Sequence, residues 1–304
     1  MQVRLMIEGQ EGVSWDEWVA LARAAEAIGL DGLFRSDHYT SFHGAPGAAL
    51  DAWATILALA PLTERLRLGT LVSAATFRHP SELARVALTA DHVSGGRVEV
   101  GVGAGWFEGE HRQNGFPFPP VAERFDRFVE YVEILVRSWS SEPFDFHGAH
   151  FNLERQRVLP APLQSPHPPL LIGGTGRPRS LRLAAAHAQE YNCAFLDVEG
   201  CVALRARLDQ ACVAIDRQPS SLRLSVMTLV SLGRNGDEAR RRHERGLELF
   251  QGPADRCHVG TLDEMTQLLA DYERAGVTRM YLQLPDRRDD EALSLMGELA
   301  RRAK

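Results

Sequence analysis

An acidic and an imidazole side chain, Asp37 and His38, stand next to each other after a short apolar stretch. A histidine can donate or accept a proton near neutral pH, because its ordinary pKa is about 6.5. The pair therefore indicates proton-transfer chemistry. A capped turn beside a structural histidine and a metal site are the alternatives. The chain contains no H-x-H or H-E-x-x-H pattern, so no metal site is predicted.

A glycine-rich turn, Gly173-Gly174-Thr175-Gly176, follows the apolar residues 170–172 and precedes a predicted helix with Pro178 in its first turn. Glycines let backbone N–H groups approach an anion, and the N-terminus of a helix adds partial positive charge. Arg177 and Arg179 would add to that charge. The pattern favours a phosphate site, and an ordinary tight turn between a strand and a helix is the alternative.

A second glycine set, Gly101, Gly103 and Gly105, ends another predicted strand and is followed by Trp106. Its spacing is not that of the G-x-G-x-x-G dinucleotide fingerprint, because Trp106 stands where the last glycine would be. Three glycines at the end of a strand suggest that the backbone closely approaches a flat ligand, with Trp106 and Phe107 as walls. Structural packing of these two aromatic side chains is the alternative.

Other residues with reactive side chains are weaker candidates. Four of them are expected in exposed loops rather than in catalysis: His79, Glu108, Glu110 and His111. The four cysteines show no C-x-x-C spacing, so the sequence predicts neither a zinc ribbon nor a disulfide framework.

Short apolar runs alternate with longer amphipathic stretches along the chain, which predicts strands followed by helices. Strands are expected over residues 3–7, 31–34, 67–72, 98–102, 170–172, 191–194, 222–230 and 280–284. Helices are expected between Ser14 and Gly29 and over residues 51–62, 81–93, 124–139, 180–188, 202–215, 237–249, 262–275 and 290–302. This order predicts an α/β fold, a closed (β/α)8 TIM barrel forming one domain over residues 1–304. An open doubly wound sheet would usually have fewer strands.

Two irregular segments interrupt this alternation, the glycine-rich residues 40–48 and the proline-rich residues 140–169. In a barrel such insertions either shape the active site or form a surface flap. The carboxyl ends of barrel strands line the active site. The predicted strands therefore bring together Asp37, His38, Leu71, Val72, Gly105, Trp106, Gly173, Gly174, Thr175, Gly176 and Asn192.

The composition excludes several classes of protein. The chain has 304 residues, of which 44% are hydrophobic and 24% charged, as is ordinary for a soluble globular protein. Its net charge of −6 argues against binding to nucleic acid or to an anionic membrane. No apolar run approaches the roughly 18 residues of a membrane span, and the start does not resemble a signal peptide. We expect a cytoplasmic protein that binds a small-molecule substrate.

An ordered set of short segments resembles the bacterial luciferase-like monooxygenase superfamily and, more narrowly, its branch that uses the deazaflavin coenzyme F420. The resemblance runs from about residue 3 to residue 300. It is carried by residues 35–39 (RSDHY), 66–72 (LRLGTLV), 75–80 (ATFRHP), 94–98 (SGGRV), 101–106 (GVGAGW), Glu110, 123–125 (ERF), 172–176 (IGGTG), Asn192, 259–261 (VGT) and 275–279 (AGVTR).

The resemblance implies a (β/α)8 barrel that binds the deazaflavin at the carboxyl ends of its strands. Asp37 and His38 would lie beside the reactive C5 atom of the ring, and His38 would exchange the proton that accompanies hydride transfer. The Leu71–Val72 peptide bond matches a cis bond that backs the ring in this superfamily. The implied cofactor contacts are Asp37, Leu71, Val72, Gly105, Trp106, Gly173, Gly174, Thr175, Gly176 and Asn192.

The chain also departs from part of this branch. Its sugar-phosphate dehydrogenases hold the substrate phosphate with lysines and an arginine, whereas Lys304 is the only lysine here. A phosphorylated sugar is therefore not the expected substrate. Segments 40–50, 108–120 and 140–169 are expected to decide which substrate binds.

The leading interpretation is an F420-dependent oxidoreductase that moves a hydride between the cofactor and an organic substrate. One alternative is an FMN-dependent monooxygenase that uses O2 and receives reduced flavin from a reductase partner. Another is a non-catalytic protein that binds flavin or deazaflavin. A homodimer is expected, because homodimers are common in the superfamily and barrel helices offer apolar faces for an isologous contact.

Overall fold

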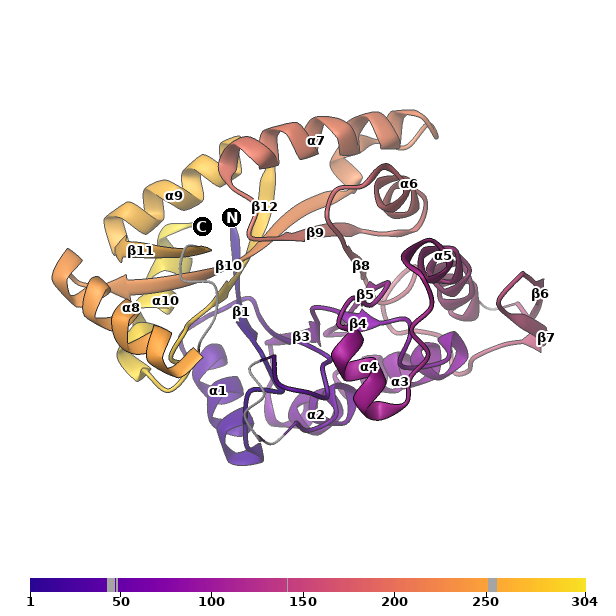
Figure 1. Ribbon diagram of the computed structural model, residues 1–304, viewed down its shortest axis with the longest axis horizontal. Coiled ribbons are helices and arrows are strands. Elements are labelled where there is room, and N and C mark those ends of the chain that lie inside the picture. The colour runs from indigo at the N-terminus through magenta and orange to yellow at the C-terminus, as the bar shows by residue number, and fades with distance from the viewer. Residues whose placement is uncertain (43–46, 48, 141, 251–255) are drawn as a thin grey trace.

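Strands and helices alternate along the computed structural model, which describes residues 1–304 apart from 43–46, 48, 141 and 251–255 (Figure 1). The strands are β1 (Gln2–Ile7), β2 (Gly32–Arg35), β3 (Arg67–Thr70), β4 (Ser73–Ala74), β5 (Val98–Gly103), β6 (Phe144–His147), β7 (Asn152–Gln156), β8 (Leu170–Gly173), β9 (Glu190–Ala194), β10 (Arg223–Gly233), β11 (Cys257–Thr261) and β12 (Val277–Gln283). The α-helices are α1 (Trp15–Ala27), α2 (Ala52–Leu59), α3 (Pro80–Val93), α4 (Glu108–Asn114), α5 (Val121–Ser138), α6 (Pro178–His187), α7 (Val198–Val213), α8 (Gly236–Phe250), α9 (Leu262–Arg274) and α10 (Asp290–Arg302).

Eight parallel strands close into a barrel in the order β1-β2-β3-β5-β8-β9-β10-β12, and β12 pairs with β1 to complete the ring. At the closure, Leu5 of β1 is in register with Leu33 of β2 on one side and with Leu282 of β12 on the other. Each of the eight strands overlaps one of the strands predicted from the apolar runs. The predicted (β/α)8 architecture is therefore confirmed.

Strand β11 was not predicted, although it belongs to the same sheet. The first part of β10 pairs with β9 in the barrel, whereas Leu229–Gly233 pairs with β11. The β11 sequence, CHVGT, is only partly buried and contains no apolar run, so no strand signal marks it. Its existence depends on the length of β10, which extends past the barrel.

The proline-rich segment lies between α5 and β8. Within residues 140–169, β6 and β7 form an antiparallel hairpin at the periphery, beside α5 in Figure 1. Residues 43–46 and 48 of the segment 40–48 lie outside the described part of the chain. Among the described helices, none has the length and apolar character needed to cross a bilayer.

Local signals set both ends of α1 as predicted. The hydroxyl of Ser14 accepts from the backbone N–H of Glu17 at 3.3 Å and caps α1, while Gly29 adopts φ +82° beyond its last turn. His79 is exposed, and its Nδ1 accepts from the N–H of Ser81 at 3.2 Å, which caps α3. This residue therefore has a structural role at a helix start.

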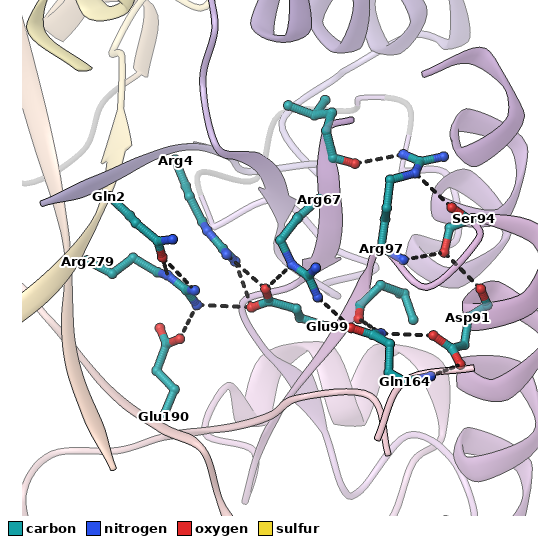
Figure 2. Close-up of polar contacts among 12 residues, drawn as sticks. Gln2, Arg4, Arg67, Asp91, Ser94, Arg97, Glu99, Gln164, Glu190 and Arg279 are labelled. Atoms are coloured by element: carbon teal, nitrogen blue, oxygen red, sulfur yellow. Dashed lines mark hydrogen bonds and ion pairs between the residues drawn. The ribbon is translucent and has the colours of Figure 1, made fainter. Parts of the chain in front are cut away.

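The amino-terminal end of the barrel is filled by a buried ion-pair network centred on Glu99 (Figure 2). Arg4 binds both carboxylate oxygens of Glu99, at 2.7 and 2.8 Å, and Arg279 binds one at 3.0 Å. Arg67 also binds Glu99, and Arg279 binds Glu190. Burial raises the pKa of Glu99, but the charges of the arginines lower it by more, so the pKa of Glu99 lies well below its usual value.

An apolar layer follows above this network, formed by Met6, Phe34, Leu171, Met227 and Tyr281. Three partly buried side chains pack on it from the carboxyl side: Leu71, Val72 and Phe195. The barrel interior thus changes along its axis from ion pairs to apolar side chains, and it ends in a partly exposed apolar floor.

We predict that Glu99→Gln lowers the free energy of unfolding by about 3–5 kcal/mol, because it leaves buried arginines without their counter-charge. Chemical denaturation at neutral pH measures the loss. Glu298→Gln, in an exposed pair with Arg302, is the control and should cost at most about 1 kcal/mol. The pKa of Glu99 is lowered by folding, so its contribution is present at neutral pH and is lost as pH falls below about 4.5. Equal stability of the two variants would contradict this prediction.

Candidate active site

His38 follows β2 at the carboxyl end of the barrel and is held by a carboxylate from α4. Its Nδ1 donates to Oε2 of Glu110 at 2.8 Å. The other oxygen of Glu110 accepts from the backbone N–H of Tyr39, and from that of Thr40 at 3.1 Å. Glu110 is 0% exposed, so the expectation that it lies in an exposed loop is wrong. These three donors compensate the carboxylate of Glu110 for its loss of contact with water.

The pKa of His38 is raised above its ordinary value. Burial alone lowers it, but the hydrogen bond and the charge of Glu110 raise it more, and Glu8 and Asp37 add to the effect. The side chain is 14% exposed, so it can still reach a bound molecule. A protonated imidazole therefore persists above pH 6.5 at the mouth of the barrel.

Asp37 precedes His38, but its carboxylate has different partners. Arg78 binds both of its oxygens, one of them at 3.2 Å, and the hydroxyl of Ser73 also donates to it. Burial raises the pKa of Asp37, although Arg78 opposes the shift. At 2% exposure Asp37 is an internal anchor, and the acid paired with His38 is Glu110.

Aromatic rings surround the exposed side of His38. Phe42 and Trp106 meet its ring edge-on, with centroids 4.7 and 5.8 Å away. Trp106 stacks on Phe107 at 5.4 Å and is 64% exposed. Trp106 and Phe107 therefore lie beside His38, and most of the Trp106 side chain is open to solvent.

The Leu71–Val72 peptide bond is cis, as the resemblance implies. The side chain of Val72 fills the space over three glycines: a Cβ at Gly103 would lie 2.9 Å from it, and Cβ atoms at Gly101 and Gly173 would lie 3.0 and 3.2 Å from it. At Gly101 a Cβ would meet the carbonyl oxygen of Thr70 even before it met Val72. The close contacts at Gly101 and Gly103 are therefore with Val72 of the apolar floor and with the neighbouring backbone, and the approach of a flat ligand to these glycines stays a prediction.

Gly105 adopts φ +82° and packs against the hydroxyl of Thr76. Next to it, His111 is buried rather than exposed: its Nδ1 donates to the carbonyl of Phe107 at 2.7 Å, and its Nε2 lies 2.6 Å from the Thr76 hydroxyl. Both ring nitrogens are used within the protein. His111 therefore supports the loop after β5, whereas Glu108 is exposed on α4.

The glycine turn 173–176 lies between β8 and α6 and is anchored by β9. The N–H of Gly174 donates to the carbonyl of Asn192 at 3.0 Å, and that of Gly176 donates to the hydroxyl of Tyr191 at 2.9 Å. In the described structure α6 begins without a side-chain cap, so its first-turn N–H groups can meet an outside acceptor such as a phosphate. Thr175 stands between the two anchored glycines.

The charged and polar side chains near this turn bind different partners within the protein. Arg179 pairs with Asp126 across the surface, and Arg207 of α7 donates to the carbonyl of Gly176. No motif marks Arg207. Asn192 is buried and its amide donates to the hydroxyl of Ser225 at 2.9 Å, which turns it toward β10.

Together these residues form an arrangement that fits a flat cofactor with an anionic tail. Leu71, Val72 and Phe195 provide an apolar floor, His38 a proton-carrying group at its edge, and the start of α6 an anion site. Phe195 was missed by sequence reasoning: it follows β9 with φ +56°, a backbone conformation for which no motif gives a signal.

Comparison with known proteins agrees with this arrangement. The family model described as luciferase-like monooxygenase matches residues 2–298. An FMNH(2)-dependent dimethylsulfone monooxygenase of Pseudomonas putida is 31% identical over 55% of this chain and 46% of its own. An F420-dependent glucose-6-phosphate dehydrogenase of Amycolatopsis mediterranei (strain U-32) is 34% identical over 51% of this chain and 47% of its own. The matches span about half the length of these curated relatives.

Solved structures share the fold over almost the whole chain. An F420-dependent secondary alcohol dehydrogenase in complex with an F420-acetone adduct superposes with a TM-score of 0.86 and 20% identity, covering 100% of this chain and 99% of that chain. A long-chain alkane monooxygenase superposes with a TM-score of 0.82 and 17% identity, covering 99% and 90%. At these identities the likeness concerns the fold. The family match over residues 2–298 shows that the chain belongs to the luciferase-like monooxygenase family.

Proposed function

We propose that this protein is an F420-dependent oxidoreductase that transfers a hydride between the deazaflavin and an organic substrate. The observation that carries the proposal is the His38–Glu110 pair, a partly exposed imidazole with a raised pKa at the edge of an apolar floor. Hydride transfer to a carbonyl carbon is accompanied by delivery of a proton to its oxygen, and the reverse reaction removes that proton from the alcohol. The proposal assigns this proton exchange to His38. F420-dependent relatives and structural neighbours support the choice of cofactor.

When bound, the deazaflavin supplies the hydride acceptor or donor. The apolar floor of Leu71, Val72 and Phe195 would hold its ring, and residues 173–176 with the start of α6 would hold its phosphate. His38 gives a proton to the substrate oxygen or takes it away. Glu110 orients the imidazole and stabilises its protonated form, while Asp37 stays buried as an anchor.

The substrate of this proposal is an organic molecule without a phosphate group. The single lysine, Lys304, pairs with Asp31 at the amino-terminal end of β2, on the other side of the barrel from His38. Near His38, the described cations Arg35 and Arg78 are bound to protein acceptors. The exposed face of Trp106 offers an apolar surface instead.

An FMN-dependent monooxygenase is the second candidate, because FMN-dependent relatives also match the chain. The same floor and the same anion site would serve FMN. That reading requires O2 and a reductase that supplies reduced flavin, and we propose such a partner only for this case. We also propose a homodimer for either candidate.

A parallel titration of the apo protein with oxidised F420 and with FMN separates the two candidates. We expect F420 to bind with a Kd in the micromolar range or below, and FMN to bind much more weakly, with fluorescence as the readout. The opposite preference would move the protein to the flavin monooxygenases. Absence of binding by both would refute the proposed cofactor site.

His38→Gln should lower kcat for reduction of small ketones by reduced F420 by roughly 10²–10⁴-fold, because the proton donor is lost. Affinity for F420 should stay near that of the wild type. The matched control is His147→Gln, on the exposed β6–β7 hairpin, which should leave kcat unchanged. Glucose 6-phosphate should not be turned over by any of these proteins. Unchanged turnover in His38→Gln would remove His38 from the chemistry.

The pH dependence of ketone reduction should depend on the charge of Glu110, because this charge raises the pKa of His38. Folding raises the pKa of His38, so ketone reduction should decline only as pH rises through a value above 6.5. In Glu110→Gln the amide oxygen can still accept from the N–H groups of Tyr39 and Thr40, but the charge is gone. The declining limb should then move to lower pH, since Glu8 and Asp37 alone raise the pKa less. A limb in the same position in both proteins would contradict the pairing.

A further inference from the structure

We propose that Arg78 is a positioning residue: its guanidinium joins Asp37 and Tyr39 to Asp51 and thereby fixes His38 in place. Arg78 lies just before α3 and has no described contact with His38 itself. The proposal rests on the role of His38 in the proposed function, but its geometry can be tested without any turnover.

The contacts of Arg78 converge from two places in the chain. Its two terminal nitrogens bind Asp37, and Nη2 also binds the hydroxyl of Tyr39 at 3.0 Å and Oδ2 of Asp51 at 2.5 Å. Asp51 in turn caps α2, because its Oδ1 accepts from the N–H of Ala54 at 2.9 Å. One planar cation therefore connects the end of β2 to the start of α2.

A buried carboxylate, Glu110, holds the same stretch through different groups. Arg78 binds the side chains of Asp37 and Tyr39, whereas Glu110 binds the ring of His38 and the N–H groups of Tyr39 and Thr40. Residues 37–40 thus lie between a cation and an anion. Opening of either set of contacts would therefore loosen the backbone that carries the imidazole.

The chemistry of this arrangement depends on an arginine. Arg78 is largely buried and Asp37 is 2% exposed, so loss of the cation would leave a buried carboxylate uncompensated. A lysine carries one compact charge and lacks the planar fork that reaches several acceptors at once. Arg78→Lys should therefore keep the charge of Asp37 balanced while losing contacts to Tyr39 or Asp51.

A purely structural role is the competing explanation, and Arg97 provides a matched control. Arg97, shown with Ser94 in Figure 2, also joins distant segments, because it donates to the carbonyls of Ala60, Leu66 and Ser94. Arg97 directly precedes β5 and Leu66 directly precedes β3, so these contacts lie toward the amino-terminal end of the barrel. Arg97→Gln should lower stability and leave His38 unaffected. A change at His38 that is specific to Arg78 variants separates positioning from general stability.

The experiment compares the wild type with Arg78→Gln, Arg78→Lys, Asp51→Asn and Arg97→Gln under conditions in which each variant is folded. Amide hydrogen exchange of Tyr39 and Thr40 is measured, and the His38 ring is titrated by NMR. In Arg78→Gln both amides should exchange roughly tenfold faster or more, because their bonds to Glu110 open more often. In Arg78→Lys, which keeps a positive charge beside Asp37, the pKa of His38 should fall, since its contact with Glu110 loosens. In Arg78→Gln the uncompensated charge of Asp37 acts in the opposite direction, because Asp37 raises the pKa of His38.

Asp51→Asn should give a smaller acceleration, since Arg78 still binds Asp37, and Arg78→Lys should lie between it and Arg78→Gln. If Arg78→Gln does not fold, these two milder variants carry the test. Wild-type exchange and an unchanged His38 pKa in the Arg78 and Asp51 variants would overturn the proposal. Equal changes in Arg97→Gln would overturn it as well.

A second measurement uses the protein loaded with F420. Arg78→Gln should lower kcat for ketone reduction while the Kd for F420 stays unchanged, and Arg78→Lys should recover part of the loss. If the wild type does not bind F420, the proposed function fails, and the exchange and titration experiments still decide the role of Arg78.

Discussion

The buried pairing of Glu99 with Arg4, Arg67 and Arg279 is the constraint on which the barrel depends (Figure 2). These residues come from four strands, so their contacts cross the interior in addition to the backbone ladders that close the ring. A shift of one residue in any of these strands would bury a charge without its partner. The free-energy cost of such an unpaired charge is much larger than the net stabilisation that the intact network provides. The network therefore constrains the register of the strands.

The ion pairs stabilise the amino-terminal end of the barrel, and the candidate active site lies at the opposite, carboxyl end. Above the ion pairs, Met6, Phe34, Leu171 and Met227 exclude water, and the partly exposed Leu71, Val72 and Phe195 complete the floor. His38 lies at this level, on a loop, where a side chain can change its protonation state without disturbing the core. Stability and chemistry are thus separated along one axis of the barrel.

At the carboxyl end, charge is balanced locally around a short stretch of backbone. Glu110 lies 72 residues from His38 in the sequence, yet it is fully buried against it, and Arg78 balances Asp37 from 41 residues away. The raised pKa of His38 is a product of these neighbours, because burial alone would lower it. Family membership leaves open which cofactor and substrate use the site, and the residues around His38 provide the physical basis for the proposed chemistry.

Features that depend on neighbouring residues could be read from the amino-acid order alone: the eight barrel strands from their apolar runs, the start of α1 from Ser14, its end from Gly29, and the family from short motifs. Features that depend on distant contacts could not. The burial of Glu110, the contacts of Arg78, the filling of the space over Gly101 and Gly103 by Val72, and the pairing of β11 with β10 all join segments that are far apart along the chain. Periodicity and motifs record local geometry, whereas a side chain's burial, partner and pKa arise only when the barrel closes and brings those segments together.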